Sequence, residues 1–267
     1  MTLDLPLGFD IYCTVLAVLF GASMGSFLNC AAWRLVHGES VLRGRSHCDS
    51  CGHELHFIDL IPIFGYLLCR GRCRYCGVKL AKSHLVAELI AAAVYGSCFL
   101  RFGFSLQCLY LLILSSLMLI IAFTDLEGYI IPDRFILAGI VVVFLSLFLA
   151  ADFTSALIKA LLGAFPLALA LLLVVVAVEK ILNREAMGGG DIKLLFLTGL
   201  SLGWQLNLLC LFFACIFGII FGVLAQRGKK EGEPSRLFPW GPAIALSWWC
   251  TILFGDSLLN LYLGFFS

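Results

Sequence analysis

Long apolar segments recur along almost the whole chain, and they constrain its fold more than any other feature. A helix that crosses a bilayer needs roughly 20 mainly apolar residues. Eight segments are candidates, the sixth being shorter than the others: residues 11–33, 84–100, 106–124, 134–150, 156–178, 191–205, 206–226 and 239–265. The sequence therefore predicts an all-α polytopic membrane protein with about eight transmembrane helices.

The composition agrees with a membrane protein. Of the 267 residues, 61% are hydrophobic and 13% are charged, whereas soluble domains are about 45–50% apolar and about 25% charged. The formal net charge of +1 gives no reason to expect a nucleic-acid partner. Residues 1–10 contain two acids and no Lys or Arg, so they lack the basic region of a cleavable signal. We expect the first apolar segment to be retained as a helix.

One long polar insertion, residues 34–83, separates the first two apolar segments. It holds eight basic residues: Arg34, Arg43, Arg45, Arg70, Arg72, Arg74, Lys79 and Lys82. Because cytoplasmic loops are enriched in Lys and Arg, we expect this loop inside and the N-terminus outside. Alternation then assigns three further loops to the cytoplasmic side: residues 125–133, 179–190 and 227–238. The loops expected outside contain a single basic residue, Arg101.

Four cysteines in the polar insertion form two Cys-x-x-Cys pairs. Cys48 and Cys51 belong to "CDSC", and after 21 intervening residues Cys73 and Cys76 belong to "CRYC". This spacing is typical of a zinc site with four thiolate ligands, and the reducing cytoplasm disfavours disulfides. We expect a structural zinc ion that folds the loop. Four metal-free thiols or a redox pair are the alternatives, and the other eight cysteines are interpreted as small buried hydrophobic residues.

Two aspartates lie at the ends of apolar segments, and the predicted topology places both at the cytoplasmic face. Asp125 closes the third segment, and Asp191 opens the sixth, 66 residues later. Ionisable residues at membrane depth are candidates for function. Two close carboxyl groups share one proton and can act as acid and base on a water that attacks an amide. Because the protons belong to the pair, neither aspartate is assigned a fixed role. The plainer alternatives are a helix N-cap for Asp191 and a solvated helix end for Asp125.

Three glycines, Gly188, Gly189 and Gly190, immediately precede Asp191. They have no side chains to block an extended peptide that approaches the carboxylate, and they permit positive φ angles. Since they also precede a helix N-terminus, we expect backbone amides in this region to help bind the oxyanion of a reacting carbonyl.

Together these features resemble the type IV prepilin peptidases, the bifunctional leader peptidase/N-methyltransferases that belong to the GxGD membrane aspartyl proteases of bacteria. The resemblance begins with "GASMGSFLNCAAWRL" and continues through the loop with its two Cys-x-x-Cys pairs to "AELIAA". The two catalytic motifs resemble "FTDLEGYIIPD", which contains Asp125, and "MGGGDIKLL", which contains Gly188, Gly190 and Asp191. "FPWGPAIAL" resembles the last block of the family.

The resemblance implies a function and a division of the chain. It implies a first helix over residues 1–33, a methyltransferase-type loop over 34–83 and a peptidase domain over 84–267. Asp125 and Asp191 are then the catalytic pair of a bacterial inner-membrane enzyme whose active site faces the cytoplasm. The enzyme removes the basic leader of prepilins or pseudopilins and methylates the new N-terminal amine with S-adenosylmethionine.

The substrate implied by the resemblance is amphiphilic, because an apolar helix follows the cut site. This helix can enter the enzyme laterally from the bilayer. We expect the basic leader to lie near three cytoplasmic acids, Glu127, Asp133 and Glu185.

Three other functions stay open from the residues alone. One is a peptidase without methyltransferase activity, and another is a membrane-anchored zinc-binding interaction module in which the aspartates only cap helices. The third is a transporter or channel with Asp125 and Asp191 along a proton or cation path. The position of both aspartates at helix ends, away from mid-membrane, disfavours the transporter.

Overall fold

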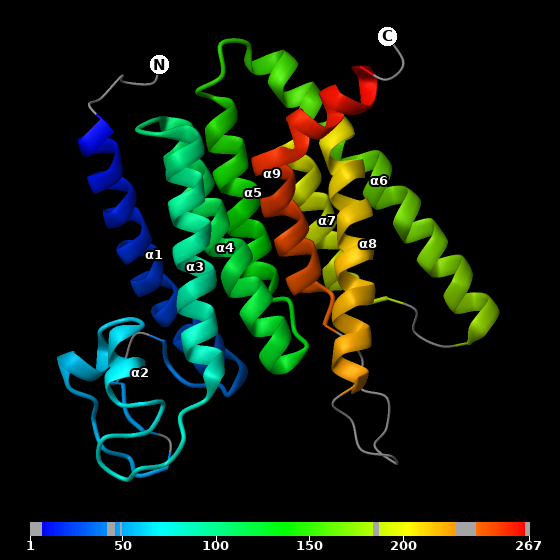
Figure 1. Cartoon of the computed structure of the whole chain (residues 1–267). Coiled ribbons are helices and arrows are strands. Elements are labelled where there is room, and N and C mark those ends of the chain that lie inside the picture. Colours follow the sequence, from blue (N-terminus) through cyan, green and yellow to red (C-terminus); the bar gives the residue numbers. More distant parts are fainter. Residues whose placement is uncertain (1–6, 42–45, 49, 184–186, 228–238, 265–267) are drawn as a thin grey trace. The chain divides into compact units, whose positions relative to one another are not determined.

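The computed structural model describes residues 7–41, 46–48, 50–183, 187–227 and 239–264. Within these ranges, each of the eight predicted segments contains a long helix (Figure 1). The long helices are α1 (Leu7–Val36), α3 (Lys82–Phe102), α4 (Leu106–Gly128), α5 (Asp133–Leu147), α6 (Phe153–Leu182), α7 (Gly189–Leu202), α8 (Trp204–Arg227) and α9 (Gly241–Gly264). The predicted all-α fold is confirmed.

Six of the helices in the described part of the chain are long and apolar enough to cross a membrane. The other two are α5, with 15 residues, and α7, with 14 residues. At a rise of 1.5 Å per residue, they are about 21–23 Å long, which is less than the roughly 30 Å of a hydrocarbon core. The chain is a multi-pass membrane protein in which two of the predicted spans are short.

The chain divides into two compact units, Met1–Phe123 and Thr124–Ser267. The division falls inside α4, so this helix contributes its last turns to the second unit. The domain limits expected from the sequence, at residues 34 and 84, concern function and stay a prediction.

In the first unit, α1 and α3 pack closely along their length (Figure 1). The contact uses two glycines of α1 spaced four residues apart. A Cβ atom on Gly21 would lie 2.7 Å from the carbonyl oxygen of Ala91, and one on Gly25 would lie 2.6 Å from that of Ala87. Small residues at this spacing let helix backbones approach in a membrane, where association depends on van der Waals contact.

The insertion between α1 and α3 contains two short helices, η1 (Phe57–Leu60) and α2 (Phe64–Leu68). Ile63, at the start of α2, has a φ of 64°, which is unfavourable for a β-branched residue. Its amide donates a 2.6 Å hydrogen bond to the buried carboxylate of Glu88 in α3. This charge-assisted bond helps hold the strained turn at the start of α2 against α3.

In the second unit, α7 packs against α6, α8, α9 and α5. Gly163 of α6 meets Gly199 of α7 backbone to backbone. Next to this contact, the buried Asn207 of α8 donates a 3.0 Å hydrogen bond to the Gly163 carbonyl and accepts a 2.9 Å bond from Thr198. Because unpaired polar groups are costly in an apolar interior, this network fixes how α6, α7 and α8 pack.

Candidate functional site

Asp125 lies in the last turns of α4 and is almost fully buried, with 5% of its surface exposed. The Gly241 amide, at the first position of α9, donates a 2.8 Å hydrogen bond to Asp125 Oδ2. Free amides and the helix dipole make a helix N-terminus a favourable place for a carboxylate. A Cβ atom on residue 241 would lie only 2.7 Å from the same oxygen. The bond therefore depends on a glycine at this position.

Asp191 is the third residue of α7 and is half-buried. The N-cap is Gly188, not Asp191, and the Gly188 backbone hydrogen bonds to the Asp191 carboxyl group. The sequence left open that Asp191 is the N-cap of this helix, and that alternative is wrong. Asp191 instead lies in the first helical turn and binds back to the cap residue, as the acid of a capping box does.

The two carboxyl groups lie close enough to interact. The Asp191 carboxyl group lies within range of the charge of Asp125. Like-charge repulsion at such range disfavours ionisation of both groups at once. The second unit thus brings together two groups that are 66 residues apart in the sequence.

The three glycines before Asp191 have different surroundings. A Cβ on Gly188 would lie 3.2 Å from Asp191 Oδ2, and one on Gly190 would lie 2.9 Å from Ile131 Cβ, whereas Gly189 has open space around it. Gly188 has a φ of −64°, and neither Gly189 nor Gly190 has a positive φ. The positive φ angles that the glycines permit are therefore not adopted, and their predicted role in leaving room for an approaching peptide stays a prediction. Their predicted role in binding an oxyanion stays a prediction.

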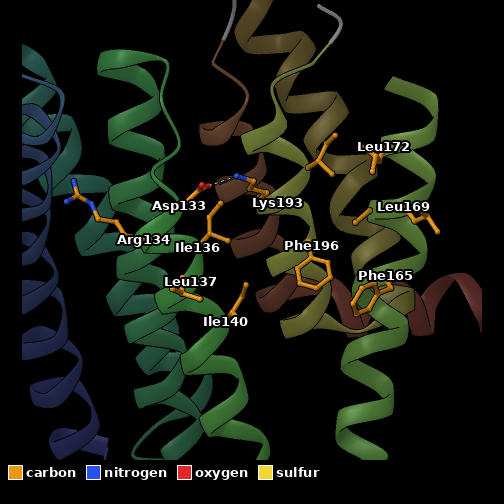
Figure 2. Close-up of a pocket in the computed structure, with 12 residues that line it drawn as sticks. Asp133, Arg134, Ile136, Leu137, Ile140, Phe165, Leu169, Leu172, Lys193 and Phe196 are labelled. Atoms are coloured by element: carbon orange, nitrogen blue, oxygen red, sulfur yellow. Dashed lines mark hydrogen bonds and ion pairs between the residues drawn. The ribbon is translucent and has the colours of Figure 1, made fainter. Parts of the chain in front are cut away.

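The acids expected near the leader have separate environments. Glu127 is exposed at the end of α4. Asp133, at the start of α5, forms a 2.7 Å ion pair with Lys193 of α7 (Figure 2). Glu185 lies outside the described residues. Lys193 was not among the residues predicted from the sequence, although it lies only two residues after Asp191.

The Gly241 amide was also missed as a partner of Asp125. The sequence feature that could have indicated this contact is the "FPWGPAIAL" block, in which α9 begins directly after Trp240. A sequence shows that a helix starts there but does not show which side chain its first amide will meet.

The four cysteines of the first unit form one cluster. All four Sγ atoms lie within 4.8 Å of one another, and the Sγ atoms of Cys48 and Cys76 are 3.9 Å apart. Tetrahedral coordination with Zn–S bonds of about 2.3 Å places the sulfurs about 3.8 Å apart. The donor set and its spacing fit a tetrahedral metal ion, so the cluster could hold one.

Each Cys-x-x-Cys pair forms the same turn. The amide of Gly52 bonds to Cys48 O at 2.7 Å, and the amide of Gly77 bonds to Cys73 O at 2.9 Å. Both glycines have positive φ, of 67° and 72°, a conformation that glycine adopts readily. In the second turn, hydrogen bonds from the backbone amides of Cys76 and Tyr75 lower the pKa of the Cys73 thiol to about 7, which favours the thiolate that a metal requires.

The segment between the two turns is attached to the second one. Asp59 of η1 forms a 3.1 Å ion pair with Arg74 and accepts a 3.2 Å hydrogen bond from the Tyr75 hydroxyl. Both partners lie between Cys73 and Cys76 in the chain. These contacts hold η1 beside the cluster on the first unit.

Comparisons with protein families match most of the chain. The bacterial peptidase A24 N-terminal domain matches residues 19–102. The type IV leader peptidase family matches residues 112–223, a range that includes Asp125 and Asp191. The two matched ranges fall on either side of a short interval that contains the start of α4.

Curated relatives are similar over nearly the whole chain. The prepilin leader peptidase/N-methyltransferase of Bacillus subtilis (strain 168) is 32% identical over 92% of this chain and 96% of its own length. The protein of the same name from Myxococcus xanthus (strain DK1622) is 34% identical over 92% of this chain and 74% of its own. The one from Pseudomonas aeruginosa is 29% identical over 97% and 95%. No solved structure matches the chain.

Proposed function

Because the chain belongs to the type IV leader peptidase family, we propose that it is a membrane aspartyl endopeptidase that removes the basic leader of type IV prepilins or pseudopilins. It then N-methylates the new N-terminal residue. The observation that carries the proposal is the interaction of Asp125 with Asp191, in a chain similar to relatives named prepilin leader peptidase/N-methyltransferase.

In the proposed cleavage step, the two aspartates act as a base and an acid that share one proton. The hydrogen bond from the Gly241 amide favours the ionised form of Asp125, so Asp191 is the member that carries the shared proton. Asp125, oriented by the Gly241 amide, takes a proton from water while the water oxygen attacks the scissile carbonyl carbon. The C–N bond of the tetrahedral intermediate then breaks as Asp191 gives its proton to the leaving nitrogen. A proton transfer from Asp125 to Asp191 restores the starting state.

The proposed second step uses the amine that cleavage releases. The amine must be unprotonated, because its lone pair forms the new N–C bond. S-adenosylmethionine would supply the methyl group: its S–CH3 bond breaks, the electron pair stays on the sulfur of the departing thioether, and the methylated amine releases a proton. In the same proposal, Cys48, Cys51, Cys73 and Cys76 hold a structural zinc ion that folds the loop between α1 and α3.

The proposed location is the bacterial inner membrane, with the N-terminus outside and the aspartates facing the cytoplasm. The basic residues of the insertion support this orientation. Within the described residues they include Arg70, Arg72 and Arg74, and such charges concentrate on the cytoplasmic side.

A single mass-spectrometric experiment tests both steps. The purified protein in detergent, and its Asp125→Ala and Asp191→Ala variants, are incubated with a prepilin and S-adenosylmethionine. We expect the wild type to release the leader and to add one methyl group to the product. Each variant should lose at least about a thousandfold in cleavage rate, because removing a general acid or base costs about 10²–10⁴ and the pair acts as a unit.

Each other outcome has a definite meaning. Normal cleavage by either variant would show that the aspartates are not catalytic. Cleavage without methylation by the wild type would favour a peptidase that lacks the second activity. No cleavage by a folded wild-type protein would refute the peptidase and leave the metal-binding interaction module.

A further inference from the structure

An apolar groove of about 680 Å³ lies in the second unit between α5, α6 and α7 (Figure 2). Its floor is formed by α7, where Phe196 packs edge-to-face against Phe165 of α6 at 5.1 Å between ring centroids. The side chains of Ile136, Leu137 and Ile140 in α5 line one wall. The volume is typical of a binding pocket.

The second wall is one face of α6. Phe165, Leu169 and Leu172 follow the spacing of a single helical face, and all three line the groove. They are 57%, 56% and 45% exposed. Since α6 is one of the helices long and apolar enough to cross a membrane, this wall is open to a ligand that stays in the bilayer.

The groove has one charged end. Asp133 and Lys193, whose ion pair is 2.7 Å long, lie at the first turns of α5 and α7 and line the groove there. Lys193 is two residues from Asp191, and Ile192, the residue after Asp191, also lines the groove, whereas neither Asp125 nor Asp191 does. The apolar walls therefore begin next to Asp191 in the chain and continue away from it along α5 and α6.

We propose that this groove receives the apolar helix that follows the cut site of the substrate. This inference rests on the proposed function, and it adds the surface on which the substrate is held. A helix in the groove with its N-terminal end at the Asp133–Lys193 pair has its preceding peptide bond at the start of α7, the turn that carries Asp191. The bond cut in a leader peptidase reaction is on that N-terminal side. A lipid acyl chain would also fit apolar walls, but it would not explain why the charged end of the groove lies at the start of α7, next to Asp191 in the chain.

The first test is photo-crosslinking from α6 in the full-length protein. A benzophenone amino acid is placed at Leu169 in the groove or at Val174 on the opposite face of the same helix. The two residues have similar exposure, 56% and 58%. The probe is a prepilin with its leader, cut site and apolar helix. We expect the yield of crosslinks to the apolar helix to be at least about tenfold higher from position 169 than from position 174. Excess unlabelled prepilin should abolish these crosslinks. Equal crosslinking from both positions, or crosslinks from 169 to lipid alone, would overturn the inference.

The second test fills the groove. Ala168 lines it, whereas Ala170 of the same helix points away from it and is exposed. We expect Ala168→Trp to lower kcat/KM about tenfold, mainly through KM, for a full-length prepilin, because a bulky side chain occupies space that the ligand needs. Ala170→Trp should leave kcat/KM unchanged.

A truncated peptide separates this inference from the proposed function. It carries only the leader and the residues around the cut site, so it should be cleaved equally by the wild type and by Ala168→Trp. If the wild type, Ala168→Trp and Ala170→Trp all cleave the full-length prepilin equally, the groove does not bind the apolar helix of the substrate. The proposed peptidase activity would be unaffected by that result. If no protein cleaves any substrate, the proposed function fails, and the crosslinking still reports whether the groove binds the helix.

Discussion

The cysteine cluster and the pair of aspartates are assembled by different parts of the chain and in different ways. Each Cys-x-x-Cys turn is closed by a backbone hydrogen bond across four residues, from Gly52 to Cys48 or from Gly77 to Cys73. The aspartates come from α4 and α7, and Asp125 is oriented by an amide 116 residues away. A local motif thus brings the four cysteines together, whereas the packing of helices forms the proposed catalytic site. The two sites should therefore fail independently and for different reasons.

The largest expected effect separates the two sites directly. Cys48→Ser should abolish tight metal binding, because the thiolates provide the folding energy of such a site, but should leave cleavage within about tenfold of wild type. Metal content by inductively coupled plasma mass spectrometry and leader release on the same sample are the measurements. Cys215→Ser, at an exposed position of α8, is the control and should retain the metal. Unchanged metal content in Cys48→Ser would show that the ligands are wrongly assigned.

The next effect concerns the helix contact that orients Asp125. Gly241→Ala places a methyl group 2.7 Å from Asp125 Oδ2, and relieving such overpacking costs about 1–3 kcal/mol. We expect kcat for leader removal to fall about ten- to a hundredfold, with the metal content unaffected. Gly222→Ala in α8, where nothing lies within 4 Å of the added atom, is the matched control. A variant at 241 as active as that control would mean that the amide does not position Asp125.

A smaller effect follows from the assignment of the shared proton to Asp191. A mechanism that needs this proton loses rate once the pH rises far enough to remove it from the pair of aspartates. We expect kcat for cleavage to decline at alkaline pH, by up to about tenfold per unit. The pH–rate profile of single-turnover cleavage measures this. A rate that rises steadily between pH 7 and pH 9 would contradict the assignment of the proton to Asp191.

The smallest effects distinguish the glycines before Asp191. Gly190→Ala pushes a Cβ to 2.9 Å from Ile131 Cβ, so we expect a loss of about 1 kcal/mol or more in unfolding free energy. Gly189→Ala should leave stability unchanged or slightly raised, because alanine favours a helix. A fall in kcat/KM for Gly189→Ala without a loss of stability would place the substrate peptide against this residue. Thermal unfolding and cleavage kinetics together make the distinction.

The sequence predicted features that depend on neighbouring residues better than those that depend on packing. In the part of the chain that the structure describes, apolar length predicted the eight long helices, and the cysteine spacing predicted the sulfur cluster. The three glycines were expected to permit positive φ angles and to share one role, yet their surroundings differ and come from Ile131 and from the Asp191 carboxylate. Gly241 and Lys193 were missed because their partners lie 116 and 60 residues away. The proposed catalytic roles of Asp125 and Asp191 themselves stay predictions.

The shortness of α7 has a consequence for the length of the leader. Gly203 connects α7 directly to α8, so the end of α7 and the start of α8 lie at the same level. From there the two helices pack against each other and run in opposite directions. Since α8 has 24 residues and α7 has 14, the first turn of α7 stops about 15 Å short of the far end of α8. An extended chain covers this depth in about four to five residues. The basic residues of the leader are expected to lie at the level of the far end of α8. We therefore expect at least about four to five residues between them and the scissile bond.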